Sequence, residues 1–221
     1  MKKYFEVLRK CPLFDNIKDE NLVEMLNCLG AKTDTYDKKE TILAEGEPAK
    51  YIGIVLSGTA QLERTDYYGN RSIVTTIEPS ELFGESFACA GADKMPVTVI
   101  ASQNCEVMLI DCQRIINPCS NACKFHNQMI FNLLKVVATK NIVLNQKAEI
   151  ISKRTTREKL MTYLLLQAKK NGCSSFTIPF DRQMLADYLE VDRSGLSAEI
   201  SKLRNEGIIE SKRSKFKINK I

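Results

Sequence analysis

The chain has 221 residues, enough for two modest domains, and 44% of them are hydrophobic, which is ample for packed cores. Its formal net charge is +5, and Lys, Asn or Gln interrupts every apolar run, which argues against a membrane span. The N-terminal stretch MKKYFEVLRK lacks a signal-peptide core, so we expect a cytoplasmic protein whose eight cysteines are reduced thiols or metal ligands.

The N-terminal half is predicted to be a short helical segment followed by a β-domain. Residues 1 to about 30 carry Leu22, Val23, Leu26 and Leu29 on one helical face. Between about 33 and 115, short apolar runs alternate with Gly, Pro and Asp turn signals, which is typical of an antiparallel sandwich or barrel. The clearest runs are Tyr51–Leu56, Gln61–Arg64, Ser72–Ile77 and Val97–Ile100.

A long helix is predicted next, from about residue 118 to 151, because this stretch has few helix breakers. Residues on one side step along it by three or four: Ile130, Leu133, Val137, Asn141, Leu144, Ala148 and Ile151. That spacing fits a coiled-coil-like seam, so we expect a homodimer through residues 125–151, with Asn141 fixing the register. The alternative is a helix that lies on its own domain.

Residues 180–216 read as a helix, a tight turn, a second helix and two short strands. Asp181 and Asp192 are candidate N-caps, since a carboxylate accepts backbone N–H groups at a helix start. Glu190 and Val191 would form the turn, and a helix that begins at Thr155 with a capping-box pattern precedes the pair. Apolar residues at helical spacing predict the buried faces: Met184, Leu185 and Leu189, then Leu196, Ile200 and Leu203.

The second helix would turn polar side chains outward, namely Arg193, Ser194, Ser197 and Lys202. The fork of an arginine matches O6 and N7 of guanine, so this face suits a DNA major groove. Gly207 ends the helix, and apolar pairs on both sides of residues 211–215 predict a small basic hairpin, the wing of a winged helix. The alternative is an ordinary hairpin of two helices.

Charge favours DNA binding. Residues 146–221 contain 16 Lys and Arg against 9 Asp and Glu, a net of +7, whereas residues 1–145 have a net of −2. Positive charge is therefore concentrated where phosphates would be met.

A small barrel, a long dimer helix and a C-terminal winged helix, in this order, resemble the CRP/FNR superfamily of bacterial transcription regulators. The resemblance covers nearly the whole chain and rests on EGEPA (45–49) with IVLSG (54–58), on LFGE (82–85), and on RQ (182–183) with DRS (192–194). It implies an α+β fold: an N-terminal helix and a double-stranded β-helix, jelly-roll-like sensor barrel in residues 1–117, a dimerisation helix in 118–151 and a winged helix-turn-helix in 152–221.

The resemblance also implies roles in binding double-stranded DNA. Arg193 would read a base edge with help from Ser194 and Ser197, while Arg182 and Gln183 would contact phosphates. Asp192 belongs to the same motif, and Lys202, Lys212, Arg213 and Lys215 complete the candidate DNA-binding set. Ala198 stands where many relatives carry Arg, and Gly195 replaces a bulkier residue, so the preferred half-site cannot be inherited from the best-known members.

Cyclic-nucleotide members of the superfamily neutralise the phosphate with an Arg-Ser or Arg-Thr pair. Met95 and Pro96 stand at these positions here; Met is uncharged, and Pro lacks a backbone N–H. Cyclic AMP bound in the usual manner is therefore not expected, and the effector is unknown. The resemblance gives Glu85 either a ribose contact or, as we favour, a structural role.

The candidate effector pocket is the segment from Phe83 to Val97. It comprises Phe83, Gly84, Glu85, Ser86, Phe87, Cys89, Met95, Pro96 and Val97. Its side chains are largely apolar, so they could line a site for a hydrophobic or aromatic effector, or could be filled core.

FNR-like members hold an iron–sulfur cluster with clustered cysteines. Here Cys119, Cys123 and His126 have the spacing C-x3-C-x2-H and would share one helical face. Thiolates and an imidazole suit zinc, iron or an iron–sulfur cluster. The spacing matches neither the N-terminal cluster pattern of FNR nor a zinc finger, so we favour ordinary packing of small apolar side chains.

We therefore expect a dimeric, sequence-specific transcription regulator without enzymatic activity, controlled by an effector other than a cyclic nucleotide. RNA polymerase is a candidate partner, although no residue identifies a surface for it. The alternatives are a metal- or redox-responsive regulator, a DNA-binding protein whose barrel has lost its ligand, and, from another class, a ligand-binding barrel or enzyme with an appended helical domain. A single His offers no convincing catalytic triad for the last of these.

Overall fold

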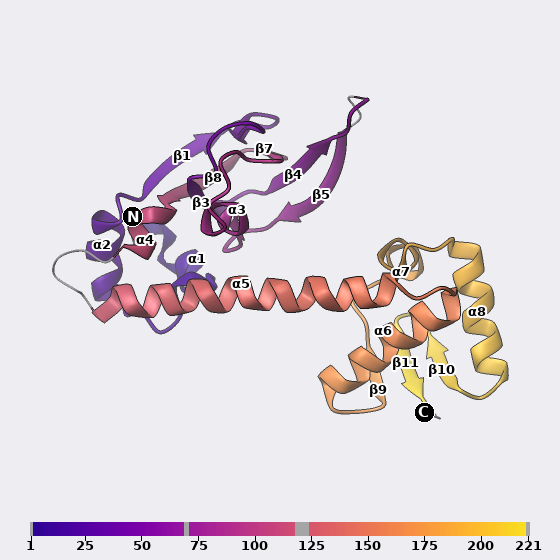
Figure 1. Ribbon diagram of the computed structural model, residues 1–221. Coiled ribbons are helices and arrows are strands. Elements are labelled where there is room, and N and C mark those ends of the chain that lie inside the picture. Colours follow the sequence, from indigo (N-terminus) through magenta and orange to yellow (C-terminus); the bar gives the residue numbers. More distant parts are fainter. Residues whose placement is uncertain (1, 69–70, 118–123, 220–221) are drawn as a thin grey trace. The chain divides into compact units, whose positions relative to one another are not determined.

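The computed structural model describes residues 2–68, 71–117 and 124–219 (Figure 1). The chain divides into two compact units, Met1–Thr139 and Lys140–Ile221. In the described residues, no helix is both long and apolar enough to cross a membrane.

The N-terminal unit begins with short helices, namely η1 (Lys2–Tyr4), α1 (Phe5–Lys10), η2 (Pro12–Phe14) and α2 (Asp19–Cys28). Leu8, Leu22 and Leu26 are fully or almost fully buried and share one hydrophobic cluster with Ile52 and Ile54 of the following sheet. Leu22, Leu26 and Leu29 of the predicted helical face thus pack in this cluster, whereas Val23 is only partly buried and lies outside it.

The β-domain consists of two four-stranded antiparallel sheets, with strand orders β1-β8-β3-β6 and β2-β7-β4-β5. Its strands are β1 (Lys32–Tyr36), β2 (Thr41–Leu43), β3 (Tyr51–Ser57), β4 (Ala60–Thr65), β5 (Arg71–Ile77), β6 (Leu82–Phe83), β7 (Thr98–Ala101) and β8 (Cys105–Asp111). Val55, Val99 and Val107 are fully buried in the hydrophobic cluster to which both sheets contribute. The predicted α+β fold with a sandwich-like N-terminal barrel is confirmed.

Three helices complete this part of the chain: α3 (Glu85–Cys89), α4 (Cys112–Ile116) and the long α5 (Lys124–Ile151). Asn132 of α5 is buried and donates to the carbonyl oxygens of Leu13 and Asp15, at 3.0 and 2.8 Å. Leu133, which the sequence places in a dimer seam, is instead buried in the core of the N-terminal unit. The helical spacing of apolar residues cannot distinguish a dimer seam from a contact with the same unit, because both bury apolar side chains.

Five large apolar residues of α5 are exposed: Phe131, Leu134, Ile142, Val143 and Leu144. Phe131, Leu134 and Ile142 share one face of the helix.

The C-terminal unit contains α6 (Thr156–Asn171), α7 (Arg182–Leu189) and α8 (Arg193–Asn205), with a three-stranded sheet of order β10-β11-β9. The strands are β9 (Ser175–Thr177), β10 (Ile209–Lys212) and β11 (Lys215–Ile218). The predicted capping box is present, since Thr155 Oγ1 accepts from the Glu158 N–H at 3.1 Å and the Glu158 carboxylate accepts from the Thr155 N–H.

The last turns of α5 contact the start of the turn between α7 and α8. Lys147 Nζ donates to the carbonyl oxygen of Tyr188 and lies 4.3 Å from the centroid of its ring. It also pairs with Glu190 at 3.6 Å. Lys147 therefore joins the last turns of α5 to the C-terminal end of α7.

Candidate nucleic-acid interface

Side-chain caps and a left-handed residue set the geometry of α7 and α8. Asp181 accepts from the Met184 N–H at 2.8 Å, and Asp192 accepts from the Gly195 N–H at 2.9 Å, so both predicted N-caps are confirmed. Glu190 ends α7 in the left-handed region with φ +53°, and the Val191 N–H reaches back to the Ala186 carbonyl at 3.1 Å. These local bonds stop one helix and start the next within three residues.

The inner face of α8 is apolar and its outer face is polar. Leu196, Ile200 and Leu203 are buried in the core of the C-terminal unit, as predicted. Arg193 and Lys202 are exposed. On α7, Leu185 and Leu189 are buried, but Met184 is 50% exposed, which corrects the predicted core assignment. Met184 lies at the edge of the buried stripe, where periodicity does not resolve which side it faces.

The serines and Asp192 at the start of α8 already have partners. Ser194 Oγ donates to the Asp192 carboxylate, which caps the helix, so Asp192 holds the helix start. These bonds to the carboxylate lower the pKa of Asp192, the Ser194 hydroxyl being the larger cause. Ser197 is half-buried, and its carbonyl accepts from Ser201 Oγ at 3.0 Å.

The two predicted phosphate contacts on α7 differ in their surroundings. Gln183 is exposed, and its Nε2 donates to Asp187 at 2.8 Å. Arg182 is half-buried, with its guanidinium carbon 5.8 Å from the ring centroid of Phe216 in β11, within cation–π range. Burial, and to a smaller extent the nearby charge of Arg204, lowers the pKa of Arg182. Arg182 thus links α7 to the β-hairpin as well as carrying charge.

The hairpin of β10 and β11 is the predicted wing. Lys212 and Lys215 are direct partners in its register, and the turn between them holds Arg213 at φ +54°. Ser214 fastens this turn to the start of α7, because its Oγ donates to the Phe180 carbonyl at 2.9 Å. Like charges directly opposite on two strands repel, so this tip would be stabilised by an anion.

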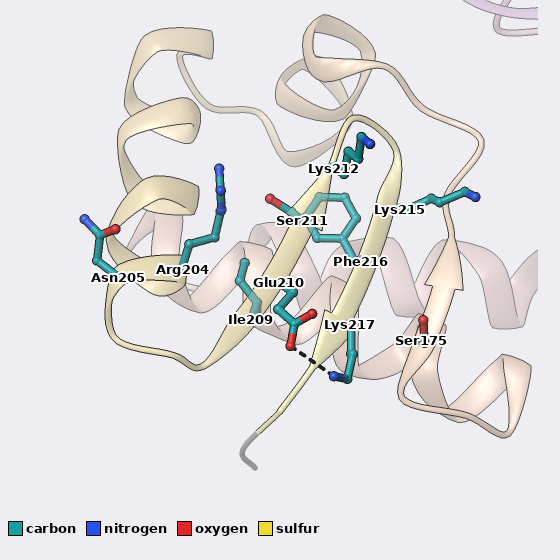
Figure 2. Close-up of a pocket in the computed structure, with 10 residues that line it drawn as sticks. All are labelled: Ser175, Arg204, Asn205, Ile209, Glu210, Ser211, Lys212, Lys215, Phe216 and Lys217. Carbon is teal, nitrogen blue, oxygen red and sulfur yellow. Dashed lines mark hydrogen bonds and ion pairs between the residues drawn. The ribbon is translucent and has the colours of Figure 1, made fainter.

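A surface groove of about 540 Å³ runs along the hairpin (Figure 2). Arg204 from α8 and Lys212 and Lys215 from the hairpin line it, while Lys217 is neutralised by Glu210 at 3.0 Å. Arg204 is a cationic residue that the sequence did not single out; its place in α8 two residues after Lys202 was the available signal.

The predicted effector segment is mostly packed core. Phe83, Met95 and Val97 are buried in the hydrophobic cluster of the barrel, with Phe87 packed against it. Gly84 has φ +76°, and a Cβ there would lie 2.7 Å from the Tyr51 carbonyl oxygen, so the fold requires glycine at this position. The packing of these side chains favours the filled-core interpretation.

Hydrogen bonds in this segment join neighbouring side chains and tie its backbone to the turn before β3. Glu85 is 2% exposed and accepts from Ser86 Oγ at 3.0 Å, which fits a structural role. The Met95 N–H donates to the Glu47 carbonyl at 2.7 Å, and Pro96 is exposed. No cationic side chain occupies positions 95 and 96.

Cys119 and Cys123 lie outside the described residues. His126 is buried, and its Nε2 donates a hydrogen bond to the Arg114 carbonyl at 2.9 Å. A nitrogen that carries this proton does not bind a metal ion at the same time. Within residues 2–68, 71–117 and 124–219, no group of three or more His, Cys, Asp or Glu side chains is arranged to hold a metal ion.

Comparison with known proteins adds to this geometry. The chain matches the cyclic nucleotide-binding domain family over residues 33–121 and the Crp-like helix-turn-helix domain family over residues 158–221. It is 24% identical to the transcriptional activator protein FnrL of Cereibacter sphaeroides, over 79% of this chain and 71% of that protein.

Two further similarities are to a protein kinase and to a solved regulator structure. The chain is 23% identical to cGMP-dependent protein kinase 2 of Rattus norvegicus over 94% of its own length but only 27% of the kinase. The solved structure of the c-di-GMP responsive global regulator CLP of Xanthomonas campestris has a TM-score of 0.53 at 14% identity, covering 92% of this chain and 100% of that chain. At that identity, the likeness bears on the fold alone.

Proposed function

The chain belongs to the CRP/FNR family of transcription regulators and is a DNA-binding regulator, and on this premise we propose that it acts as a homodimer. Each copy would place its α8 in the major groove of one half-site, with the two half-sites about one helical turn apart. Residues 1–117 would sense, residues 118–151 would pair the two copies, and residues 152–221 would bind DNA.

The observation that carries the proposal is the capped, polar N-terminal turn of α8. Its start is fixed by Asp192, its inner face is buried, and Arg193 stands exposed at its first position. Arg193 would bind a guanine edge, with Ser194 and Ser197 beside it. Arg182, Gln183 and Lys202 would contact phosphates.

Gly195 supports the same placement. Its backbone φ is not positive, and a Cβ built there would meet only a carboxylate oxygen of Asp192, at an ordinary 3.8 Å. Packing within the protein therefore does not require glycine at this position, although glycine weakens a helix. A close approach of DNA to the first turn of α8 would explain why a side chain is missing there.

The wing would add contacts to phosphates. Lys212, Arg213 and Lys215 gather at the hairpin tip, and Arg204 lines the adjoining groove. Their mutual repulsion would fall on binding a phosphate backbone, so we expect binding to weaken steeply as salt rises.

The exposed apolar side of α5 supports pairing of two copies. Phe131 and Leu134 are 61% and 65% exposed on one helical face, and Ile142 continues the apolar surface. Exposed apolar side chains in a row are expected to be covered by a partner. Leu134→Glu should therefore shift the native mass from dimer to monomer and weaken binding to a two-half-site DNA.

Thr139→Glu is the matched control, because Thr139 is also exposed on α5 but lies more than a third of a turn away from Leu134. If both variants stay dimeric, the pairing surface lies elsewhere.

The regulatory input is proposed to act through the α3 segment without a cyclic nucleotide. Met95 is buried core and Pro96 offers no N–H, so these two positions supply neither the cation nor the donor that the usual cyclic-phosphate site places there. An effector of other chemistry, a cytoplasmic location, the absence of enzymatic activity and contact with RNA polymerase complete the proposal.

Arg193→Ala tests the base-reading role. The variant should lose about tenfold to hundredfold in affinity for the cognate site, selected from random sequence, and much less for non-specific DNA at the same salt. Lys170→Ala, an exposed charge at the end of α6, should change both affinities little. An equal loss on specific and non-specific DNA with Arg193→Ala would overturn the role.

A further inference from the structure

Two cysteines of the N-terminal unit meet across helices that are far apart in the sequence. Cys89 is the last residue of α3, Cys112 is the first residue of α4, and their sulfur atoms are 3.7 Å apart. A disulfide requires about 2.05 Å between the sulfurs, so they would need to approach by about 1.7 Å. A thiol of one residue and the sulfur of the other already share a hydrogen bond.

The two thiols differ in access and in acidity. Cys112 is 1% exposed in the hydrophobic cluster, whereas Cys89 is only partly buried. The hydrogen bond from Cys112 lowers the pKa of Cys89, although burial and the charge of Glu85 oppose it. The same bond, together with burial, raises the pKa of Cys112. Cys89 is thus both the more accessible and the more acidic thiol, which are the two properties of a reactive cysteine.

We propose that Cys89 and Cys112 form a dithiol modification site, which a hydroperoxide converts into a disulfide that ties α3 to α4. The Cys89 thiolate attacks one peroxide oxygen, the O–O bond breaks, and the other oxygen leaves as water or an alcohol after taking a proton. Cys112 sulfur then attacks the sulfenic sulfur of Cys89, and hydroxide leaves and takes the Cys112 proton as water. The two thiols are oxidised by two electrons, and the peroxide is reduced.

The position of this pair gives the modification a route to α5. Cys89 ends the helix that Gly84 and Glu85 begin, in the candidate effector segment. Cys112 begins α4, and the Arg114 carbonyl in α4 accepts from His126 of α5. A bond between α3 and α4 therefore restrains an element that touches the dimer helix. This regulatory consequence rests on the proposed function, in which α5 pairs two copies that bind DNA.

Peptide mapping of the full-length protein tests the chemistry. Reduced protein is treated with hydrogen peroxide under air-free conditions, alkylated and digested with trypsin. Cleavage at Arg71, Lys94 and Arg114 puts Cys89 in one peptide and both Cys105 and Cys112 in the next. The expected product is these two peptides joined, lighter than their sum by two hydrogen atoms.

Variants identify the partner of Cys89. The link should persist in Cys105→Ala and Cys173→Ala, and vanish in Cys112→Ala, with each fold checked by circular dichroism. If no link forms in the wild type, or if it survives in Cys112→Ala, the proposal is overturned.

DNA binding tests the regulatory half. The linked wild type should differ from the reduced protein by about tenfold in affinity for the cognate site, and reducing agent should reverse the change. In Cys112→Ala, which cannot form the link, peroxide treatment should leave the affinity for the cognate site unchanged. An unchanged affinity in fully linked protein would overturn the regulatory role.

The mapping does not depend on DNA. If the reduced protein bound no specific site while the link still formed, the proposed function would fail and the dithiol would stand. If the reduced protein bound its specific site but no link formed, the proposed function would stand and the dithiol proposal would fail.

Discussion

Two glycines at the two ends of α8 should respond to the same substitution in opposite ways. Gly195→Ala adds a methyl group to an exposed helical position, and the nearest atom outside the helix backbone is 3.8 Å away, so no strain is introduced. Replacing glycine by alanine in a helix stabilises the folded state by about 0.5–1 kcal/mol. The free energy of unfolding of the C-terminal unit should rise by that amount.

Gly207→Ala is the matched control just past the other end of the helix. Gly207 has φ +70°, and its N–H donates to the Arg204 carbonyl at 3.0 Å, closing the helix end. An L-residue in this left-handed conformation costs about 1–2 kcal/mol. The two variants should therefore differ in unfolding free energy by roughly 2 kcal/mol, in denaturant titrations of the full-length protein.

DNA affinity should follow the opposite order. If DNA approaches the first turn of α8, the methyl group of Gly195→Ala should weaken binding to the cognate site by about tenfold, or ~1.4 kcal/mol. Gly207→Ala should leave affinity nearly unchanged at temperatures where it is folded. A Gly195→Ala variant that is more stable and binds the cognate site as well as wild type would refute our reasoning about DNA approach. A less stable variant would refute our assignment of Gly195 as unconstrained.

Three further outcomes can be checked by unfolding experiments. Lys147→Met should lower the unfolding free energy of the C-terminal unit by about 2 kcal/mol, since it removes a charged donor and a cation from Tyr188. Lys153→Met, at a half-buried lysine that pairs with Glu149 at 4.0 Å, should cost under about 0.5 kcal/mol. Tyr163→Phe should leave stability unchanged or raise it by up to about 1 kcal/mol in thermal melts, because the buried hydroxyl has no hydrogen-bond partner among the described residues; a clear loss would reveal a partner. The folded state depresses the pKa of Asp192, so its stabilising effect is present above the unfolded pKa and fades as pH falls below about 4; Asp192→Asn should flatten the acid side of a stability–pH curve, and an unchanged slope would contradict this.

Local hydrogen-bond chemistry made the helix boundaries of the C-terminal unit predictable. Asp181 and Asp192 cap their helices because a short carboxylate reaches the N–H three residues ahead whatever the rest of the fold does. The strand β9 was not predicted, since three residues carry too little alternation to be recognised. Its existence depends on pairing with β11, which is a tertiary contact.

Apolar periodicity was less informative about which surface a side chain meets. Leu133 packs into its own unit, whereas Leu144 of the same predicted seam is exposed. Phe131, Leu134 and Ile142 are also exposed, on a neighbouring stripe of α5. Similarly, the sequence showed that Met95 is uncharged but could not show that it fills the core. Both outcomes depend on which elements come together, and this is not encoded in the spacing along one element.

The packing of Met95 also restricts how this protein could evolve. Its side chain is 2% exposed, and its backbone exchanges two hydrogen bonds with the turn at residues 46 and 47. An arginine placed there by a single mutation would bury a cation and force a longer side chain into a packed core, at a cost of several kcal/mol. A phosphate-binding arginine at this position would therefore require compensating changes in the side chains packed around it. Position 95 thus offers no single-mutation route to a phosphate-binding arginine.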